Sequence, residues 1–244
     1  MSEQRAGARR DRHRATHSME AVLTEAVALL DAAGEQALTF RALAARLGGG
    51  QASIYWYVAS RDELLDRASD FAVESVLATI RALPTTDDPI DDLRTIAVAL
   101  FDGVVDRPWL AAYFLRNTSV QPSSLAIYEH LGQQTLRLDL TARQRFHAVS
   151  AITGYVIGTA TDLGQEPPDA VVRGSVTRDA FLGQAADEWR ALDPDEYPFV
   201  HHIVDEFAVH VDADQFRAGL DLLLNGLRLQ ARAGDERPSR RPRR

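Results

Sequence analysis

The sequence predicts an all-α protein with an N-terminal helical module and a larger C-terminal helical domain. Beyond residue 89, apolar residues recur at spacings of three and four in one segment after another, which is the period of helices that bury one face. No alternation of apolar and polar residues, the pattern of a half-buried strand, continues there for any length. A chain of 244 residues suits one or two domains and can bury a large core.

The first two helices are short and bury one side each. The first is expected over residues 18–33, with Gly34 as its stop. Thr39 then caps a second helix, because its hydroxyl can accept a hydrogen bond from a free N–H of the first turn. The apolar residues of this second helix repeat at the spacing of a single face, namely Phe40, Leu43, Ala44 and Leu47.

A glycine turn at residues 48–50 joins the second helix to a third one, over residues 51–58. Two helices that meet across so short a turn form a helix-turn-helix, whose second helix lies in the major groove of DNA. The alternative is a helical hairpin that only packs. We disfavour it because Ile54 and Val58 can face the core while polar and aromatic side chains project outward. These outward residues are Gln51, Ser53, Tyr55, Trp56 and Tyr57.

The remaining helices follow from caps, breaks and periodicity. Ser60 and Glu63 stand in the spacing of a capping box, which opens a long helix over residues 61–83. Breaks are expected at 85–89 and 164–170, where proline interrupts the pattern. Further helices are expected over 90–105, 108–116, 122–138, 141–163, 172–192, 197–210 and 213–231.

The charge is unevenly distributed along a chain whose net charge is −8. Residues 1–17 hold five Arg and two acids, and residues 232–244 hold six Arg and two acids. Both tails lack the apolar residues that would compensate their ordering entropy, so we expect both to be disordered. The first tail precedes the helix-turn-helix directly, where a basic arm can reach the minor groove or the phosphates.

Three motifs between residues 18 and about 72 together resemble the DNA-binding domain of TetR-type bacterial transcriptional regulators. That family shows L-x-x-L-A-x-x-L-G, then L-Y-x-H-x, then a capped D-E-L-L helix. This chain has LTFRALAARLG, IYWYV and SRDELL. Two positions depart from the pattern, because Gly49 replaces a hydrophobic residue and Tyr57 replaces the usual His. The hydroxyl of Tyr57 still leaves a donor for a phosphate.

The resemblance implies a DNA-binding site centred on the helix-turn-helix, over residues 18–67. Arg41 and Gln51 are the expected base readers, since Arg pairs with guanine and Gln with adenine. Ala52 and Ser53 are small enough for close approach to a thymine methyl. Contacts that set the register on phosphates are expected from the other residues of the site. These are Tyr55, Trp56, Tyr57 and Arg61, with Thr39 beside them.

The resemblance also implies that residues 68–231 form an effector-binding and dimerisation domain. Helices 141–163 and 213–231 are unusually apolar, and Gly154 and Gly158 permit close approach of a neighbouring helix. They could form the core of a monomer, but the family pattern favours a homodimer that reads a palindromic operator. The interface is expected to centre on Val149, Thr153, Val156, Leu220, Leu223 and Leu227.

A small organic effector is the second expected partner. Aromatic side chains with polar tips suit a pocket for a flat, largely apolar molecule. The candidate lining residues are Phe101, Trp109, Tyr113, Phe114, Tyr128, His147 and Tyr155. A ligand among them would move helix 61–83, swing the recognition helix and release the DNA.

Several other classes of protein are disfavoured. The absence of Cys excludes disulfides and thiolate metal sites. No apolar run is long enough to span a membrane and no secretory signal is present, so a cytoplasmic protein is expected. His202 and Glu206 lie one turn apart, yet no metal framework surrounds them, and we expect no metal and no cofactor. No catalytic motif indicates an enzyme. A constitutive or architectural DNA-binding protein without an effector is the remaining alternative.

Overall fold

The computed structural model describes residues 17–116, 121–163 and 176–235, and all regular structure within these ranges is helical. The N-terminal helices are α2 (Met19–Ala37), α3 (Phe40–Arg46) and α4 (Gln51–Ile54). The central helices are α5 (Arg61–Arg81), α6 (Pro89–Val105), α7 (Pro108–Arg116), α8 (Pro122–Leu136) and α9 (Ala142–Leu163). The last are α11 (Arg178–Arg190), α12 (Pro198–Val209) and α13 (Asp212–Asp235). The all-α prediction is confirmed.

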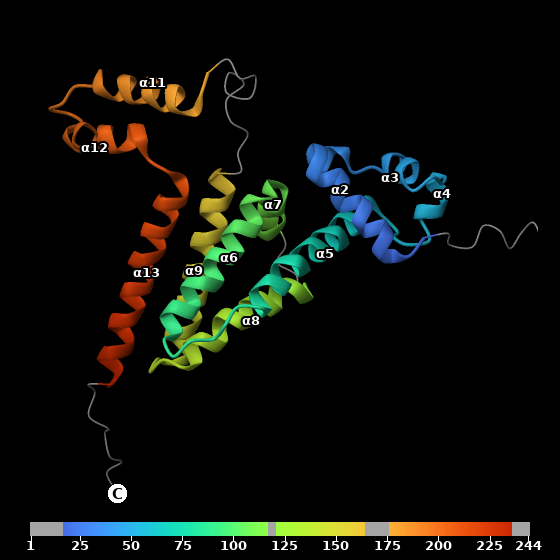
Figure 1. The fold of residues 1–244 in the computed structure, drawn as a ribbon, viewed down its shortest axis with the longest axis horizontal. Coiled ribbons are helices and arrows are strands. Elements are labelled where there is room, and N and C mark those ends of the chain that lie inside the picture. Colours follow the sequence, from blue (N-terminus) through green and yellow to red (C-terminus); the bar gives the residue numbers. More distant parts are fainter. Residues whose placement is uncertain (1–16, 117–120, 164–175, 236–244) are drawn as a thin grey trace, which may run out of the picture.

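The N-terminal module lies at one end of an elongated molecule, and α5 runs from it into the central body (Figure 1). Side-chain caps begin its helices as expected: the Thr39 hydroxyl accepts from the N–H of Ala42 at 3.1 Å, and the Ser60 hydroxyl accepts from the N–H of Glu63 at 3.1 Å. The helical geometry of α2 breaks at Ala33 and at Gly34, whose φ is +68°. The expected stop at Gly34 is therefore a kink, after which the helix continues to Ala37.

The central body is built around α6, which packs against α5, α8, α9 and α13. Proline occupies the first turn of α6, α8 and α12, where its missing N–H has no helical partner to lose. One apolar core runs continuously from α2 through α5 and α6 to α9 and α13. The N-terminal module therefore shares its core with the rest of the molecule at α5.

A buried ion pair closes the connection between α5 and α6. Asp92 is 4% exposed, and its carboxylate accepts from the Thr86 N–H at 2.9 Å and from the Arg137 guanidinium at 2.5 Å. Burial of this carboxyl opposes ionisation, but the Thr86 and Arg137 hydrogen bonds outweigh it and lower the pKa of Asp92. The loop after α5 is thereby fixed to the end of α8.

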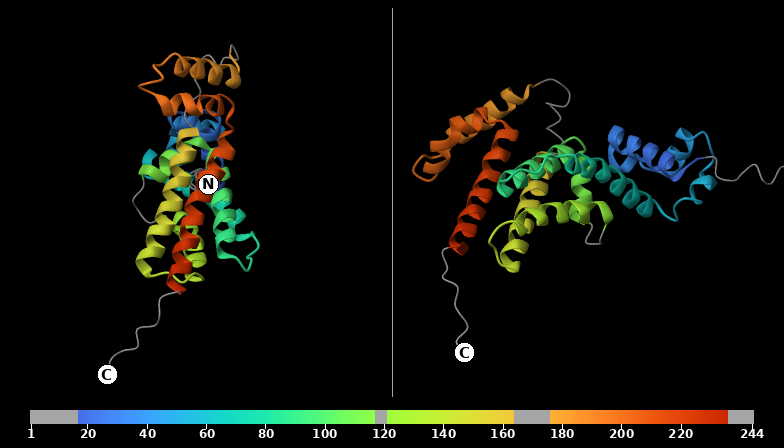
Figure 2. Two further views of the ribbon diagram at one scale, coloured as in Figure 1. Left: turned by 90° about the vertical axis from the view of Figure 1, so that its left-hand side faces the viewer. Right: turned by 60° about the horizontal axis from the view of Figure 1, so that its bottom comes forward.

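The last three helices stand to one side of the body (Figure 2). α13 lies along α6 and α9, whereas α11 and α12 pack mainly against each other as a projecting hairpin. Trp189 stacks on Phe207 between them, with ring centroids 4.0 Å apart. The hairpin leaves apolar side chains at its surface, among them Phe199 and Val209.

Most helix bounds differ modestly from the sequence predictions, but the helix expected over residues 51–58 is wrong in length: α4 ends at Ile54, and residues 55–57 form a turn. α8 ends at Leu136 instead of residue 138, and α11 begins at Arg178 instead of residue 172. α13 extends to Asp235, so a disordered tail beginning at residue 232 was wrong by four residues. The rest of both expected tails, residues 1–16 and 236–244, lies outside the described residues.

Candidate DNA-binding surface and sensor core

The recognition segment is held to the module by its two inward apolar residues. Ile54 and Val58 are 1% and 2% exposed, as the spacing of four predicted. Gly48 adopts a φ of +69° after α3, a conformation that suits glycine because it has no Cβ. The turn thus presents the opposite side of residues 51–57 to solvent.

Two large aromatic side chains dominate that outward side. Tyr55 is 63% exposed and Trp56 is 80% exposed. The ring of Tyr55 meets Phe40 of α3 edge to face, with centroids 4.8 Å apart, so one of its faces is fixed while its edge stays accessible. Gln51 and Ala52 are also exposed at the start of α4. Ser53 is half-buried, and its hydroxyl donates to the Gly50 carbonyl at 2.6 Å.

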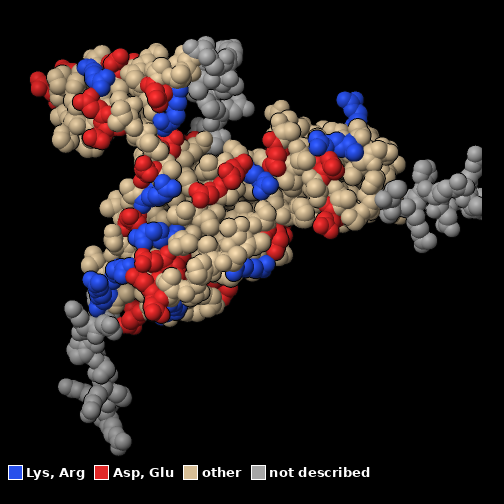
Figure 3. Space-filling view, in the orientation of Figure 1, with Lys and Arg blue, Asp and Glu red and all other residues tan. Residues whose placement is uncertain are grey.

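The arginines of the module differ in whether their guanidinium groups already form ion pairs or hydrogen bonds. Arg46 pairs with Glu25 at 2.7 Å and Arg67 pairs with Glu63 at 2.7 Å. Arg61 is also engaged, whereas Arg41 is exposed and has no ionic or hydrogen-bonding partner among the described residues of the chain. Arg41 therefore has its guanidinium available for an external acceptor, as its predicted role in base reading requires. In Figure 3 the end of the module farthest from the body carries few charged side chains.

Arg61 has a structural role inside the module. Its guanidinium donates to the Leu38 carbonyl at 2.9 Å and to the Glu35 carbonyl at 2.6 Å. These carbonyls lie at the end of α2, where helical acceptors have no internal partner. The side chain thus closes α2 against the start of α5, and because it is still 40% exposed, the DNA contact at this position stays a prediction.

The Tyr57 hydroxyl also forms a hydrogen bond within the module. Its half-buried hydroxyl donates to the His17 carbonyl at 2.7 Å. The predicted phosphate contact is therefore replaced by an anchor that ties the residue preceding α2 to the recognition segment. Sequence reasoning missed this role because His17 and Tyr57 are 40 positions apart.

The aromatic residues predicted to line an effector pocket separate into two groups. Phe101 is buried and stacks on Phe216 with centroids 3.7 Å apart, and Tyr155 stacks on the same ring at 5.6 Å. The Tyr155 hydroxyl donates to the Phe216 carbonyl at 3.1 Å. A Cβ on Gly219 would collide with that hydroxyl at 2.0 Å, so glycine is needed where α13 passes Tyr155.

Three further aromatic residues lie in or against the same core. Tyr113 is 3% exposed and meets Phe114 edge to face at 5.8 Å. Tyr128 packs on the core, with its hydroxyl 3.3 Å from that of Ser150. These three residues, with Phe101 and Tyr155, remain the candidates for an effector site.

Trp109 packs against the same core but also contacts α2, whereas His147 lies apart from the group. The Trp109 indole N–H donates to the Asp31 carboxylate of α2 at 2.8 Å. His147 is exposed and lines a surface groove between α9 and α13. The predicted lining role of His147 is corrected, because its side chain is exposed outside the aromatic core, while that of Trp109 stays a prediction.

Comparison with known proteins identifies the whole arrangement. Residues 22–68 match the family model described as bacterial regulatory proteins, tetR family, and residues 82–231 match the model described as Tetracyclin repressor-like, C-terminal domain. The chain belongs to the TetR family of transcriptional regulators. Its N-terminal module is the DNA-binding helix-turn-helix of that family.

Related proteins of actinobacteria extend the match over the chain. The TetR regulator SCO7222 of Streptomyces coelicolor shares 35% identity, with a TM-score of 0.74, over 88% of this chain and 99% of that one. The repressor DrrR1 of Streptomyces coeruleorubidus is 25% identical over 91% of this chain and 82% of its own length. An HTH-type transcriptional regulator of Saccharopolyspora erythraea is 30% identical, but the match spans only 59% of this chain and 60% of that relative. ActR of S. coelicolor, solved with actinorhodin, shares the fold with a TM-score of 0.72 and 21% identity, over 89% of this chain and 99% of that one.

The exposed face of α9 and α13 coincides only in part with the predicted one, because Leu223 and Leu227 border it. Four of the six residues expected at the centre of a subunit interface are at most 6% exposed within the single chain, and they therefore belong to its own core. They are Val149, Val156, Leu220 and Leu227, while Thr153 and Leu223 are half-buried. The exposed large apolar residues of these helices are instead Phe146, Leu222 and Leu229.

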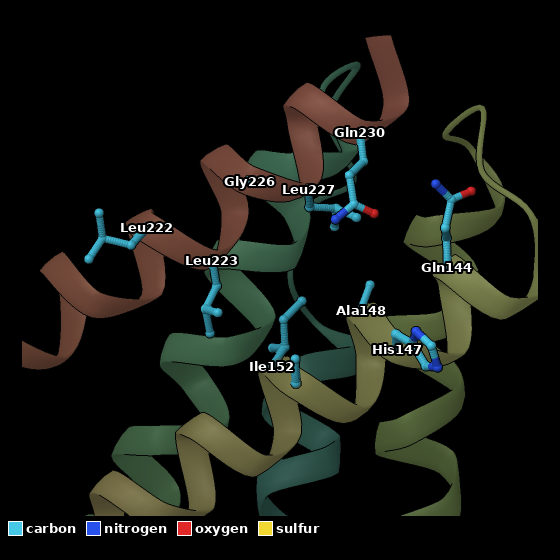
Figure 4. Close-up of a pocket in the computed structure, with 10 residues that line it drawn as sticks. Gln144, His147, Ala148, Ile152, Leu222, Leu223, Gly226, Leu227 and Gln230 are labelled. Atoms are coloured by element: carbon cyan, nitrogen blue, oxygen red, sulfur yellow. The ribbon is translucent and has the colours of Figure 1, made fainter. Parts of the chain in front are cut away.

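A groove of about 310 Å³ runs between α9 and α13 on this exposed face. Ala148 and Ile152 of α9 lie opposite Leu223 and Leu227 of α13 (Figure 4). The surface beside three glycines is open, because a Cβ at Gly154, Gly158 or Gly226 would meet no atom of the chain within 4 Å. A neighbouring helix can therefore approach closely there. The close spacing of Gly154 and Gly158 was the sequence signal for this face.

The described part of the regulator holds neither a membrane span nor a metal cluster. None of its helices combines the length and the apolarity needed to cross a membrane. Nor do its His, Asp and Glu side chains gather anywhere in a group of three or more that could hold a metal ion.

Proposed function

We propose that this TetR-family regulator is a homodimeric repressor, which binds a palindromic operator and is released from it by a small organic effector. The exposed recognition segment carries the proposal. Gln51 and Trp56 face solvent there, and Arg41 is the arginine without a partner in the described DNA-binding module. An unpaired guanidinium can read guanine through two hydrogen bonds, and an exposed amide can read adenine.

The exposed apolar face of α9 and α13 supports the proposed homodimer. Leu222 and Leu229 are 77% and 66% exposed, and exposed apolar residues on one face mark an interaction surface. Small residues beside them allow a second pair of helices to approach closely, which suits a four-helix interface with two-fold symmetry. A dimer doubles the contact that one short recognition helix makes with DNA. The relative DrrR1 is a repressor, which favours repression here.

The aromatic core of the sensor domain supports the effector. Phe101, Phe216 and Tyr155 form parallel rings, with Tyr113 and Tyr128 on neighbouring helices. Planar apolar molecules pack well against such rings. ActR, with the same fold, binds actinorhodin, so this architecture can hold a polycyclic aromatic compound. We therefore expect the effector to be planar and largely apolar.

Release of DNA requires the effector to bind one arrangement of the domains more tightly than the other. α5 joins the DNA-binding module to the sensor core and contacts α6, α7 and α8. An effector that displaces these helices also moves α5 and the recognition segment with it. A tenfold loss of operator affinity needs about 1.4 kcal/mol of coupling, within the usual range for allosteric proteins.

The test pairs a panel of planar aromatic compounds with measurements of operator binding. We expect at least one compound to stabilise the protein against thermal unfolding and to lower its operator affinity about tenfold. Tyr155→Ala, which opens the aromatic stack, should weaken that compound's binding, while Phe199→Ala on the exposed hairpin serves as a control. Compounds that bind without changing operator affinity would contradict the switch and favour a constitutive DNA-binding protein.

A further inference from the structure

The DNA-binding module meets the sensor domain at a second place besides the continuous helix α5. Asp31, near the end of α2, accepts from the Trp109 indole N–H at 2.8 Å and from the Arg107 guanidinium at 3.3 Å. Both donors come from the corner between α6 and α7. Asp31 is a single carboxylate of the module that engages two side chains of the sensor domain.

Arg107 extends this contact to α5. Its guanidinium also donates to the Ser75 hydroxyl at 3.3 Å, so α2, α5 and the corner before α7 converge on one side chain. Arg107 and Asp31 are 31% and 38% exposed, and Trp109 is half-buried. Partial burial limits solvent screening of the ion pair, and the indole adds a directional hydrogen bond that salt does not screen.

The two donors are rigidly placed. Pro108 lies between Arg107 and Trp109, and its ring fixes φ at the first position of α7. α7 packs along α9, which belongs to the sensor core. A displacement of α7 therefore moves Arg107 and Trp109, and their hydrogen bonds transmit this movement to Asp31.

The module that receives this displacement is itself rigid. Arg61 joins the end of α2 to the start of α5, and Tyr57 joins the recognition segment to His17. α2, α3 and α4 therefore turn together. A constraint at Asp31, in the C-terminal half of α2, therefore sets the direction in which the recognition segment points.

We propose that Asp31, Arg107 and Trp109 form an interdomain latch that fixes the angle of the DNA-binding module and makes α7, alongside α5, a transmitter of sensor movements. These are positioning residues, since none of them faces the DNA. The inference rests on the proposed homodimer, because the angle of each module determines the spacing of the two recognition segments. Without the latch, the two modules of a dimer must lose orientational freedom to match their half-sites. This loss weakens binding to the complete operator.

The test compares the wild-type protein with Asp31→Ala and Trp109→Phe on three DNA duplexes: the complete operator, one half-site, and an operator whose half-sites are one base pair farther apart. We expect both variants to bind the half-site within twofold of wild type. Their affinity for the complete operator should fall about three- to tenfold, and their discrimination against the longer spacer should weaken. The double variant should lose little more than the larger single effect, since both changes open the same latch.

Asp214→Asn is the matched control, because it breaks an exposed ion pair within α13 and should leave all three affinities unchanged. Unaltered spacing preference in both latch variants would overturn the proposal, as would an equal loss on the half-site and on the complete operator. A wild-type protein that is monomeric and indifferent to spacing would instead refute the proposed homodimer, which distinguishes the two failures.

Discussion

The recognition segment and the outer face of α9 and α13 both expose large apolar side chains, but in different chemical surroundings. Trp56 lies in a module that also presents an exposed Gln51 and an Arg41 with no partner among the described residues. Leu222 lies beside glycine and alanine on a face of two long helices. The first combination suits a charged, hydrogen-bonding groove, and the second suits close contact with other helices. An exposed apolar side chain therefore indicates a partner, and its neighbours indicate which kind.

The largest effect should come from placing a charge on the α9–α13 face. Leu222→Glu would bury a carboxylate in the proposed dimer interface, so we expect a monomer in sedimentation velocity. Loss of the second half-site should reduce operator affinity about 100-fold or more. Leu125→Glu, at a 52% exposed position on α8, is the control. A Leu222→Glu protein that remains dimeric would show that the subunits meet elsewhere.

The buried ion pair between Asp92 and Arg137 should matter for stability and not for recognition. Asp92→Ala leaves a guanidinium that is 34% exposed, so we expect a loss of about 1–3 kcal/mol, below that of a fully buried pair. Chemical denaturation measures it, with Asp214→Ala as the exposed control. A loss within 0.5 kcal/mol of the control, roughly the scatter of surface substitutions, would contradict the structural role of the pair.

The pH dependence of that loss has a definite sign. The pKa of Asp92 is lowered in the folded protein, so its stabilisation is complete at neutral pH and above the unfolded pKa of about 4. It declines as the pH falls below that value and through the folded pKa. The difference in unfolding free energy between wild type and Asp92→Ala should therefore shrink as the pH falls below about 4.

Arg41 and Arg46 offer a comparison within a single helix. Arg41→Ala should cost about 1–3 kcal/mol of operator binding and relax the preference at one base pair. Arg46→Ala should change binding much less, because its guanidinium pairs with Glu25. Titration of a set of single-base operator variants distinguishes these outcomes. Equal effects of the two substitutions on every sequence would mean that Arg41 contributes charge alone.

The smallest effect is expected from Tyr57→Phe. The lost hydrogen bond to His17 should reduce stability by about 0.5–1.5 kcal/mol and leave the salt dependence of DNA binding unchanged, since no charge is removed. In a chain shortened to begin after residue 17, the same substitution should have almost no effect on either property. A persistent loss of DNA affinity in the shortened chain would restore the phosphate contact that the sequence suggested.

Sequence reasoning succeeded where the determinants are local. Thr39, Gly48 and Ser60 act within three or four residues of their partners, so their patterns predicted the module correctly. It failed where a side chain meets a distant segment: Trp109 and Asp31 are 78 positions apart. The face of α13 posed a further difficulty, because this helix is apolar on two sides and periodicity alone does not tell which side the core covers.

The central claim is that two copies of the chain read one palindrome through their recognition segments. Its most direct test is sedimentation of the protein with its operator, combined with hydroxyl-radical footprinting of the same complex. The account predicts two chains per duplex and two protected regions on one face of the DNA, about one helical turn or slightly more apart. One chain per duplex, or a single protected region without two-fold symmetry, would contradict it.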